Sequence, residues 1–157
     1  MQISGICTRV GTLNVIGQMG HYQVMDVRIY YEDTDAGGVV YHANYIKYME
    51  RARTEYFRSH GFLVAELADK GFVFPVVRLE IDFKSPALHD DLLSVTTCPT
   101  RISGSSATFN QKIIRPSDNR VLADGLVTLA CIGPGLKARR IPVEIRRMLE
   151  GDMENVI

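Results

Sequence analysis

Two aspartates and a histidine lie close together in the sequence, at the point where a strand pattern gives way to a helix pattern. Asp33 and Asp35 come first, and His42 follows shortly before the predicted helix. The first turn of a helix has backbone N–H groups without partners, and these groups and the helix dipole favour negative charge. Gly37 and Gly38 lie between the acids and the histidine, and glycine lets the backbone come close to a ligand. The segment therefore indicates an active-site loop that leads into a buried helix.

Each of these polar residues also has a structural explanation. Aspartate is common where a strand becomes a loop, so Asp33 and Asp35 are compatible with a turn. A single histidine near a helix start is more often structural than catalytic. Glu55, in the following helix, is compatible with a solvated or ion-paired surface position. The residue types alone leave both interpretations open.

A second group of polar residues forms a short basic cluster near the C-terminus. Lys137, Arg139 and Arg140 are compatible with phosphate binding and equally with a solvated turn. The three cysteines are widely spaced, and the sequence has neither a C-x-x-C pair nor a paired-histidine spacing. We therefore expect no disulfide framework and no metal site. Motifs of the P-loop, nucleophile-elbow and H-E-x-x-H types are also absent from the sequence.

The candidate loop is preceded by a predicted strand and followed by a predicted long helix. Met25, Val27 and Ile29 alternate with polar residues, which is typical of a half-buried strand. Asn44 is a favourable N-cap and Gly61 fits a helix C-terminus, so the sequence predicts a helix that begins at Asn44. One apolar stripe runs along this helix, formed by Tyr45, Tyr48, Met49, Ala52 and Tyr56.

After a short helix at 63–70, the hydrophobic pattern changes to a period of two, which predicts strands. These strands span 77–84, 92–102, 107–115 and 121–132, and a last helix runs from Pro142 to about residue 150. Pro99 predicts an interruption or an edge placement of its strand. The strand at 121–132 is apolar on both faces in places, which predicts a central position. Hairpin-length turns join the strands, so we expect an α+β fold with one antiparallel sheet of about five strands and a long helix on one face.

The composition is that of an ordinary globular chain of 157 residues, the size of a single domain. We expect this domain to span 23–157, after a weakly structured extension at 1–22. Basic and acidic residues balance at 18 each, so no overall field favours nucleic acid or an anionic membrane. No apolar run reaches the roughly 18–20 residues of a membrane span. Unpaired cysteines fit a cytoplasmic protein.

The loop and the predicted helix also carry a family resemblance. The residues from Val27 to Phe57 read VRIYYEDTDAGGVVYHANYIKYMERARTEYF. This segment closely resembles the hotdog-fold acyl-CoA thioesterases of the 4-hydroxybenzoyl-CoA thioesterase family, and most closely the branch associated with the Tol-Pal cell-envelope system. The similarity rests on the motif D-x-D-x-x-G-x-V and on the tyrosine-containing helix that follows. It covers about residues 24–145 and leaves the N-terminal extension unmatched.

The resemblance implies a fold, a site and partners. In the family a sheet wraps around the long helix, two such units pair, and dimers often form tetramers. The family's catalytic carboxylate matches Asp35, and its oxyanion-binding backbone N–H matches that of His42, whose side chain is a further candidate. The residues expected to bind substrate are Gly37, Gly38, Val39 and Tyr41 in the loop, with Lys137, Arg139 and Arg140 for the phosphates of coenzyme A. No cofactor is implied, and acyl carrier protein is a second candidate partner.

The implied reaction is hydrolysis of an acyl-CoA to a carboxylic acid and coenzyme A. The Asp35 carboxylate either attacks the thioester carbonyl or activates a water, and both routes fit the sequence. Two other functions stay open: a hotdog hydratase or dehydratase that acts on acyl thioesters, and a non-catalytic module that binds acyl carrier protein or envelope components. No motif specifies the acyl chain length or decides between dimer and tetramer.

Overall fold

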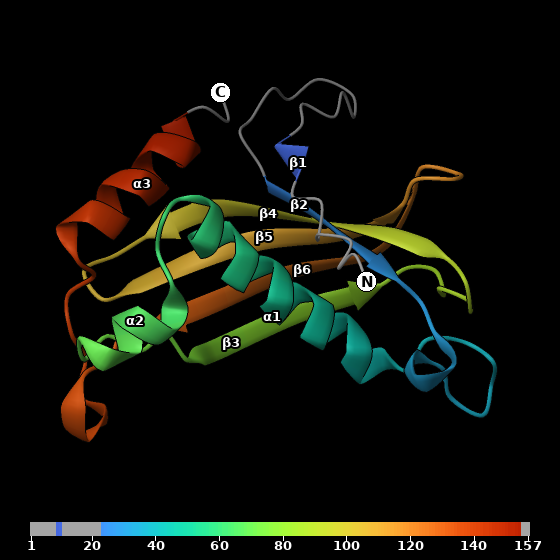
Figure 1. Cartoon of the computed structure of the whole chain (residues 1–157), viewed down its shortest axis with the longest axis horizontal. Helices are drawn as coiled ribbons and strands as arrows, with labels where there is room; N and C mark the ends of the chain where they lie inside the picture. Colours follow the sequence, from blue (N-terminus) through green and yellow to red (C-terminus); the bar gives the residue numbers. More distant parts are fainter. Residues whose placement is uncertain (1–8, 11–22, 155–157) are drawn as a thin grey trace, which may run out of the picture.

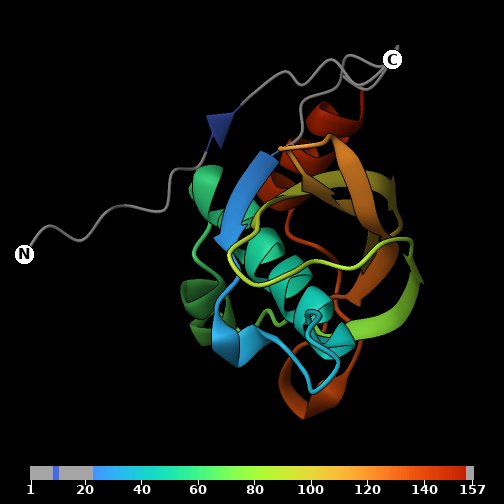
Figure 2. The same cartoon turned by 90° about the vertical axis from the view of Figure 1, so that its right-hand side faces the viewer.

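A curved antiparallel sheet wraps around one long helix (Figures 1 and 2). The computed structural model describes residues 9–10 and 23–154. The helices are α1 (His42–Ser59), α2 (Val64–Asp69) and α3 (Val143–Glu154), with short 3-10 turns η1 (Tyr31–Asp33) and η2 (Pro134–Leu136). The strands are β1 (Arg9–Val10), β2 (Gln23–Arg28), β3 (Val76–Phe83), β4 (Leu92–Ile102), β5 (Ser106–Arg115) and β6 (Arg120–Ala130). The predicted hotdog fold of the α+β class is confirmed.

Strand β3 forms one edge of the sheet. The strands follow the order β1-β2-β4-β5-β6-β3, and each neighbouring pair is antiparallel. Within the described residues, β3 therefore pairs with β6 alone. It nevertheless exposes apolar side chains, with Val76 at 47%, Val77 at 61% and Phe83 at 49%. An edge strand of this kind is available for pairing with another chain.

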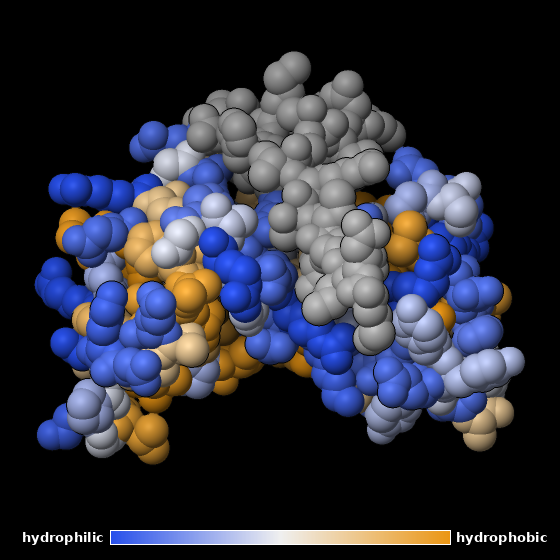
Figure 3. Space-filling view, viewed as in Figure 1, coloured by the Kyte–Doolittle hydropathy of each residue, from blue (hydrophilic) through white to orange (hydrophobic). Residues whose placement is uncertain are grey.

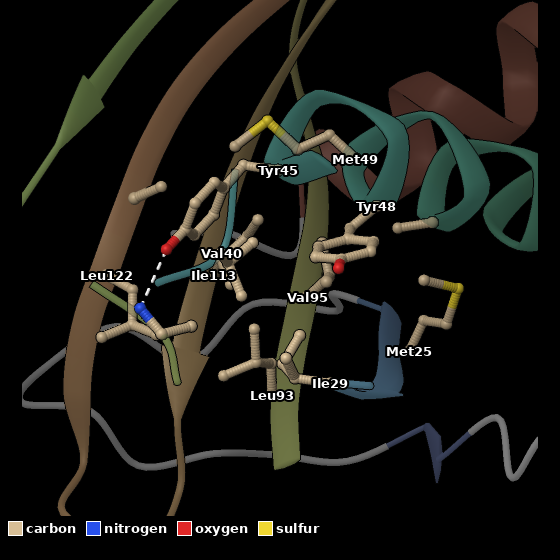
Figure 4. Close-up of a cluster of buried hydrophobic side chains, with 13 residues drawn as sticks. Met25, Ile29, Val40, Tyr45, Tyr48, Met49, Leu93, Val95, Ile113 and Leu122 are labelled. Atoms are coloured by element: carbon tan, nitrogen blue, oxygen red, sulfur yellow. Dashed lines mark hydrogen bonds between the residues drawn. The ribbon is translucent and has the colours of Figure 1, made fainter. Parts of the chain in front are cut away.

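Helix α1 lies across the concave face of the sheet, which curves around it in Figure 2. Its apolar stripe enters two core clusters, one for each half of the helix. Tyr45, Tyr48 and Met49 belong to the first cluster, shown in Figure 4. Tyr56 belongs to the second cluster, which also contains Ile145 of α3. The predicted helix stripe is thus the face that holds α1 on the sheet.

Helix α3 is joined to the end of α1 by polar contacts as well as by the second core cluster. The Tyr56 hydroxyl donates a hydrogen bond of 2.5 Å to the Asp152 carboxylate. The His60 ring nitrogen Nε2 lies 3.1 Å from the same carboxylate oxygen. The C-terminal half of α1 is therefore fixed from both the sheet and α3.

A buried polar group lies between α1 and the sheet. Gln111 of β5 is fully buried and accepts a hydrogen bond of 2.9 Å from the Arg53 guanidinium of α1. Its side-chain amide donates to the Met49 carbonyl at 2.9 Å and to the Thr97 hydroxyl at 2.8 Å. Burial lowers the pKa of the Arg53 guanidinium. Among the described residues, no carboxylate forms a salt bridge with this arginine, so Gln111 is its side-chain partner.

Several details differ from the sequence predictions. Helix α1 begins at His42 with Tyr41 as the N-cap, so the prediction that Asn44 caps the helix is wrong. Strand β4 lies between β2 and β5, so the edge placement of Pro99 is wrong, whereas the interruption is confirmed as a register shift after Pro99. In the part of the chain that the structure describes, the pairing of β2 with β4 reaches Thr97, and no described residue on that side needs the N–H that Pro99 lacks.

The predicted extension at 1–22 lies outside the described residues apart from β1, which pairs with β2. Strand β6 has partners on both sides, as its apolar character predicts. None of the helices in the described ranges combines the length and the apolar character of a membrane span.

Candidate active site

The loop between η1 and α1 is closed at its neck by backbone hydrogen bonds. Thr34 and Val40 form an antiparallel bridge. Inside the neck, the Asp35 N–H donates to the Val39 carbonyl at 2.9 Å, and the Gly38 N–H donates to the Asp35 carbonyl at 3.0 Å. Asp35 therefore sits in a short, internally bonded loop directly before the start of α1.

The Asp35 carboxylate is exposed and is oriented by its own loop. Its Oδ1 accepts a hydrogen bond of 2.8 Å from the Gly37 N–H, while no described group bonds Oδ2. A Cβ atom at Gly37 would lie 3.1 Å from Oδ1, closer than most such contacts. Gly38 has φ of +77°, a left-handed conformation that favours glycine. Both glycines therefore have a structural reason beside the predicted one of close approach by a ligand.

The N-terminus of α1 has no side-chain cap. Tyr41 occupies the N-cap position and makes no capping hydrogen bond. The Asn44 N–H donates to the Tyr41 carbonyl at 2.9 Å. Within the described part of the chain, the N–H groups of His42 and Ala43 have no acceptor. These are donors of the kind that can bind an oxygen carrying negative charge.

Aromatic residues surround this helix start. The His42 ring is tilted against Tyr41, with centroids 4.4 Å apart, and meets the edge of Phe83 of β3 at 6.3 Å. Phe83 also packs against Tyr45 at 5.5 Å. The Tyr45 hydroxyl accepts a hydrogen bond of 2.9 Å from the Ala87 N–H, the bond drawn in Figure 4, and burial raises the pKa of this hydroxyl. The helix start is thus packed against the end of the edge strand.

Asp33 supports the loop rather than facing outward with Asp35. Its carboxylate accepts a hydrogen bond of 2.8 Å from the Tyr30 N–H. Its carbonyl accepts from the Tyr41 N–H at 2.9 Å and from the Asn44 side chain at 2.8 Å. Burial, together with the nearby Asp33 carboxylate, raises the pKa of the Tyr48 hydroxyl. The Tyr48 hydroxyl itself is buried and has no hydrogen-bond partner within the described residues.

The basic cluster lies at the other end of the fold from the candidate loop. Lys137, Arg139 and Arg140 follow η2, which Figure 1 places beyond α2, far from the loop that precedes α1. The Arg139 guanidinium donates to the Gly71 carbonyl at 2.9 Å and stacks on the Phe72 ring at 3.8 Å. Lys137 and Arg140 are exposed, and neither forms an ion pair among the described residues.

The fold of the single chain thus brings together only part of the predicted site. The loop and helix-start residues Asp35, Gly37, Gly38, Val39, Tyr41 and His42 are adjacent, and the basic cluster is separate from them. Sequence reasoning missed the Ala43 N–H and the exposed Phe83 ring beside His42. The alternation of β3 indicates that Phe83 faces the helix, but its contact with the helix start depends on the curvature of the sheet. No group of three or more potential ligand side chains in the described residues could hold a metal ion.

Comparison with known proteins identifies the family. A family model described as the thioesterase superfamily matches residues 37–122. The acyl-CoA thioester hydrolase YbgC of Escherichia coli is 42% identical over 120 residues, which cover 76% of this chain and 89% of that protein. The acyl-CoA thioesterase YbgC of Haemophilus influenzae is 42% identical over 122 residues, covering 76% of this chain and 88% of that protein. Both alignments span most of the relative's length.

Solved structures agree with the match to the family. A probable thioesterase from Bartonella henselae superposes with a TM-score of 0.73 at 35% identity, over 77% of this chain and 99% of that one. A gentisyl-coenzyme A thioesterase superposes with a TM-score of 0.73 at 31% identity, over 78% of this chain and 98% of that one. The sheet and the helix described above are thus the common scaffold of these proteins.

Proposed function

This chain is an enzyme of the thioesterase superfamily, and from that premise we propose that it hydrolyses acyl-CoA to a carboxylic acid and coenzyme A. The observation that carries the proposal is the uncapped start of α1, where the N–H groups of His42 and Ala43 lack acceptors beside the loop of Asp35. The YbgC relatives support the resemblance to the Tol-Pal-associated branch. A cytoplasmic location is part of the proposal and rests on the unpaired cysteines of the sequence.

In the proposed mechanism the thioester carbonyl oxygen binds to the open N–H groups at the start of α1. Negative charge develops on this oxygen as the carbonyl is attacked, and one fixed donor of this kind contributes about 10²–10³ in rate. The His42 N–H is the first such donor. The thiol of coenzyme A leaves readily because its pKa is near that of an ordinary thiol, about 8.5. The site therefore needs no strong general acid.

Asp35 supplies the attacking group, either directly or through water. The Gly37 N–H holds Oδ1, which leaves the lone pairs of Oδ2 for the reaction. As a nucleophile, Oδ2 forms a mixed anhydride with the acyl group, which water then hydrolyses; as a general base, it takes the proton of an attacking water. In a single turnover in ¹⁸O-labelled water, mass spectrometry of the peptide with Asp35 shows label in the carboxylate only if an anhydride formed and water attacked it at Cγ of Asp35. Label in the carboxylate indicates the nucleophile.

The active unit in this proposal is a dimer that forms through the β3 edges. Two copies of an edge strand related by a two-fold axis pair antiparallel, so the start of one β3 lies beside the end of the other. Phe83, at the end of β3, packs on the helix start. Pro75, just before the start of β3, accepts a hydrogen bond through its carbonyl from the last residue of β6, and β6 is followed shortly by η2. Pairing would therefore bring η2 of the partner to the Asp35 loop. Exposed apolar residues gather near α2 and the start of β3, which supports burial of this side (Figure 3).

A dimer of this form gives the basic cluster a role. Lys137 and Arg140 project from the turn after η2 and would bind the phosphates of an acyl-CoA held in the partner's site. Arg139 shapes this turn through its bonds to the Gly71 carbonyl and its stacking on Phe72. Dimers of this kind can assemble further into tetramers, and acyl carrier protein, which carries the same phosphopantetheine thioester, is a second candidate substrate carrier.

The central test is release of thiol from a panel of short and long acyl-CoAs, followed with a thiol reagent. We expect the wild type to release thiol and Asp35→Asn to lose at least about 100-fold in kcat while its unfolding temperature is unchanged. Asp69→Asn, the same change at an exposed position of α2, is the matched control and should keep full activity. An inactive wild type across the panel refutes the hydrolase, and an active Asp35→Asn refutes the role of Asp35.

The dimer and the shared site are tested with mixed variants. The double variant Lys137→Ala/Arg140→Ala should have a higher KM for acyl-CoA. Its KM for acyl-pantetheine, which lacks the nucleotide phosphates, should be unchanged. Mixing this protein with Asp35→Asn should restore a low KM, because each mixed dimer then holds one complete site. Val77→Lys should yield monomers in light scattering, since it places a charge among the exposed apolar residues that the dimer would bury. If mixing does not restore the low KM for acyl-CoA, the basic cluster does not act on the partner's site.

A further inference from the structure

Asn44 has an unusual role for a polar residue at the start of a helix. It is the third residue of α1 and only 8% exposed. An asparagine near a helix start usually accepts a hydrogen bond from a backbone N–H of the first turn through its side-chain oxygen. Here its side-chain nitrogen donates at 2.8 Å to the Asp33 carbonyl on the other side of the loop. The acceptor is a carbonyl oxygen, so only the amide nitrogen can make this bond.

The acceptor of this bond is the residue that holds both ends of the loop. The Asp33 carbonyl takes a second hydrogen bond of 2.9 Å from the Tyr41 N–H, so both of its lone pairs are occupied by groups at the start of α1. The Asp33 carboxylate binds the Tyr30 N–H at 2.8 Å and so fixes the incoming strand. The strand end, the loop and the helix start are thus tied together through one residue.

The use of Asn44 as a donor has a consequence for the first turn of α1. Its side chain does not cap the helix, and Tyr41 makes no side-chain cap either. The N–H groups of His42 and Ala43 therefore stay open to a ligand oxygen, while the same side chain holds the Asp35 loop next to them. A capping side chain at this point would occupy the donors that the proposed reaction requires.

We propose that Asn44 is a positioning residue for thioester hydrolysis, and that its bond to the Asp33 carbonyl sets the separation between the Asp35 carboxylate and the open N–H groups of α1. This inference rests on the proposed function. Asn44 does not touch the substrate; it acts through Asp33 and the loop. A small displacement of a reacting group lowers kcat strongly, by about 100-fold for 1 Å. Substrate binding depends on the acyl and coenzyme A contacts, so KM changes little.

The test compares two variants that remove the donated bond in different ways. Asn44→Leu keeps the approximate size and removes the polar group, and Asn44→Asp keeps the shape and replaces the donor by a carboxylate. We expect kcat to fall about 10–100-fold in both, with KM within about threefold of wild type, at a temperature at which both are folded. Asn119→Asp, the same chemical change in the exposed turn between β5 and β6, should leave kcat unchanged.

A second readout separates positioning from a loss of stability. A protonated carboxyl group can donate its O–H to the Asp33 carbonyl. The ratio of kcat for Asn44→Asp to kcat for wild type at the same pH should therefore rise as pH falls towards the carboxyl pKa, and the ratio for Asn44→Leu should stay constant.

Each outcome bears on a different statement. A wild type without thiol release overturns the proposed function itself. With an active wild type, variants that keep kcat within about threefold, or whose loss lies in KM, overturn the positioning role. If both variants fail to fold, Asn44 is a residue of the fold and the inference is wrong. A fall in kcat with unchanged KM and recovery of Asn44→Asp at low pH supports it.

Discussion

The hydrogen bonds of Gln111 allow a quantitative prediction about the core. Gln111→Leu removes the acceptor of the Arg53 guanidinium and the donor to the Thr97 hydroxyl, all in the interior. A hydrogen bond to a charged group contributes about 1.5–3 kcal/mol, and a neutral one about 1 kcal/mol. The Met49 carbonyl lies within α1, where a helical hydrogen bond is available to it. Loss of the bond from Gln111 to this carbonyl therefore adds little to the loss of stability. We expect Gln111→Leu to lower the free energy of unfolding by about 3 kcal/mol.

The second variant in this test is Arg53→Met, which leaves the Gln111 side-chain oxygen without its donor. Its expected cost is about 1–3 kcal/mol, the penalty of one buried unsatisfied polar group. The double variant replaces both partners by apolar side chains of similar size, a change that is often neutral or stabilising. It should therefore be more stable than Gln111→Leu alone. The coupling energy between the two positions should exceed about 2 kcal/mol.

The assay is urea unfolding followed by circular dichroism, with thermal unfolding as a second measure. For a chain of this size, 3 kcal/mol corresponds to about 6–12 °C in unfolding temperature. The matched control is Gln111→Glu, which keeps the acceptor for Arg53 and introduces a counter-charge. It should be more stable than Gln111→Leu. Additive losses in the double variant would refute the claim that Gln111 is the partner that makes burial of Arg53 tolerable.

Two further outcomes concern the far end of α1 and the candidate loop. The hydrogen bond to the Asp152 carboxylate raises the pKa of His60, so its stabilising effect is complete below about pH 6 and is lost as pH rises through the folded-state pKa. Urea titrations between about pH 6 and 9 should show this loss, and His60→Gln should reduce it. Gly38→Ala should cost about 1 kcal/mol through its positive φ alone, because no atom lies within 4 Å of the added Cβ. Gly104 has no positive φ, and a Cβ added there also has no atom within 4 Å. Gly104→Ala should therefore lower the unfolding temperature less than Gly38→Ala in the same thermal assay.

The regular elements could be predicted because their sequence periods match their geometry. The alternation in the sequence at 77–84 corresponds to β3, and the stripe from Tyr45 to Tyr56 is the buried face of α1. The motif from Asp33 to Val40 marked the loop correctly, since its hydrogen bonds are local. Such patterns depend on residues that are neighbours in the sequence, and a single sequence is therefore enough to predict them.

The predictions that failed depend on partners distant in the chain. Asparagine is a favoured N-cap residue, but the side chain of Asn44 bonds to the Asp33 carbonyl across the loop. The helix begins two residues before Asn44. Pro99 suggests an edge strand, yet β4 lies between β2 and β5, and among the described residues the pairing with β2 reaches only Thr97. The place of Lys137 relative to Asp35 depends on the course of the whole sheet, and its contact with substrate stays a prediction. No local pattern encodes such relations.

The two buried polar residues of α1 should respond differently to substitution, and this difference separates support of the helix from support of the reaction. Arg53 is bonded to Gln111 about 16 Å along the helix axis from His42, at 1.5 Å per residue. Between them, the Tyr45 hydroxyl is bonded to Ala87 and holds the first turns independently. Gln111→Leu should therefore lower stability and leave kcat within about threefold at a temperature at which the protein is folded. Asn44 holds the loop itself, so its substitution should change kcat first. A large fall in kcat in Gln111→Leu would mean that the position of the helix start is set by the whole length of α1.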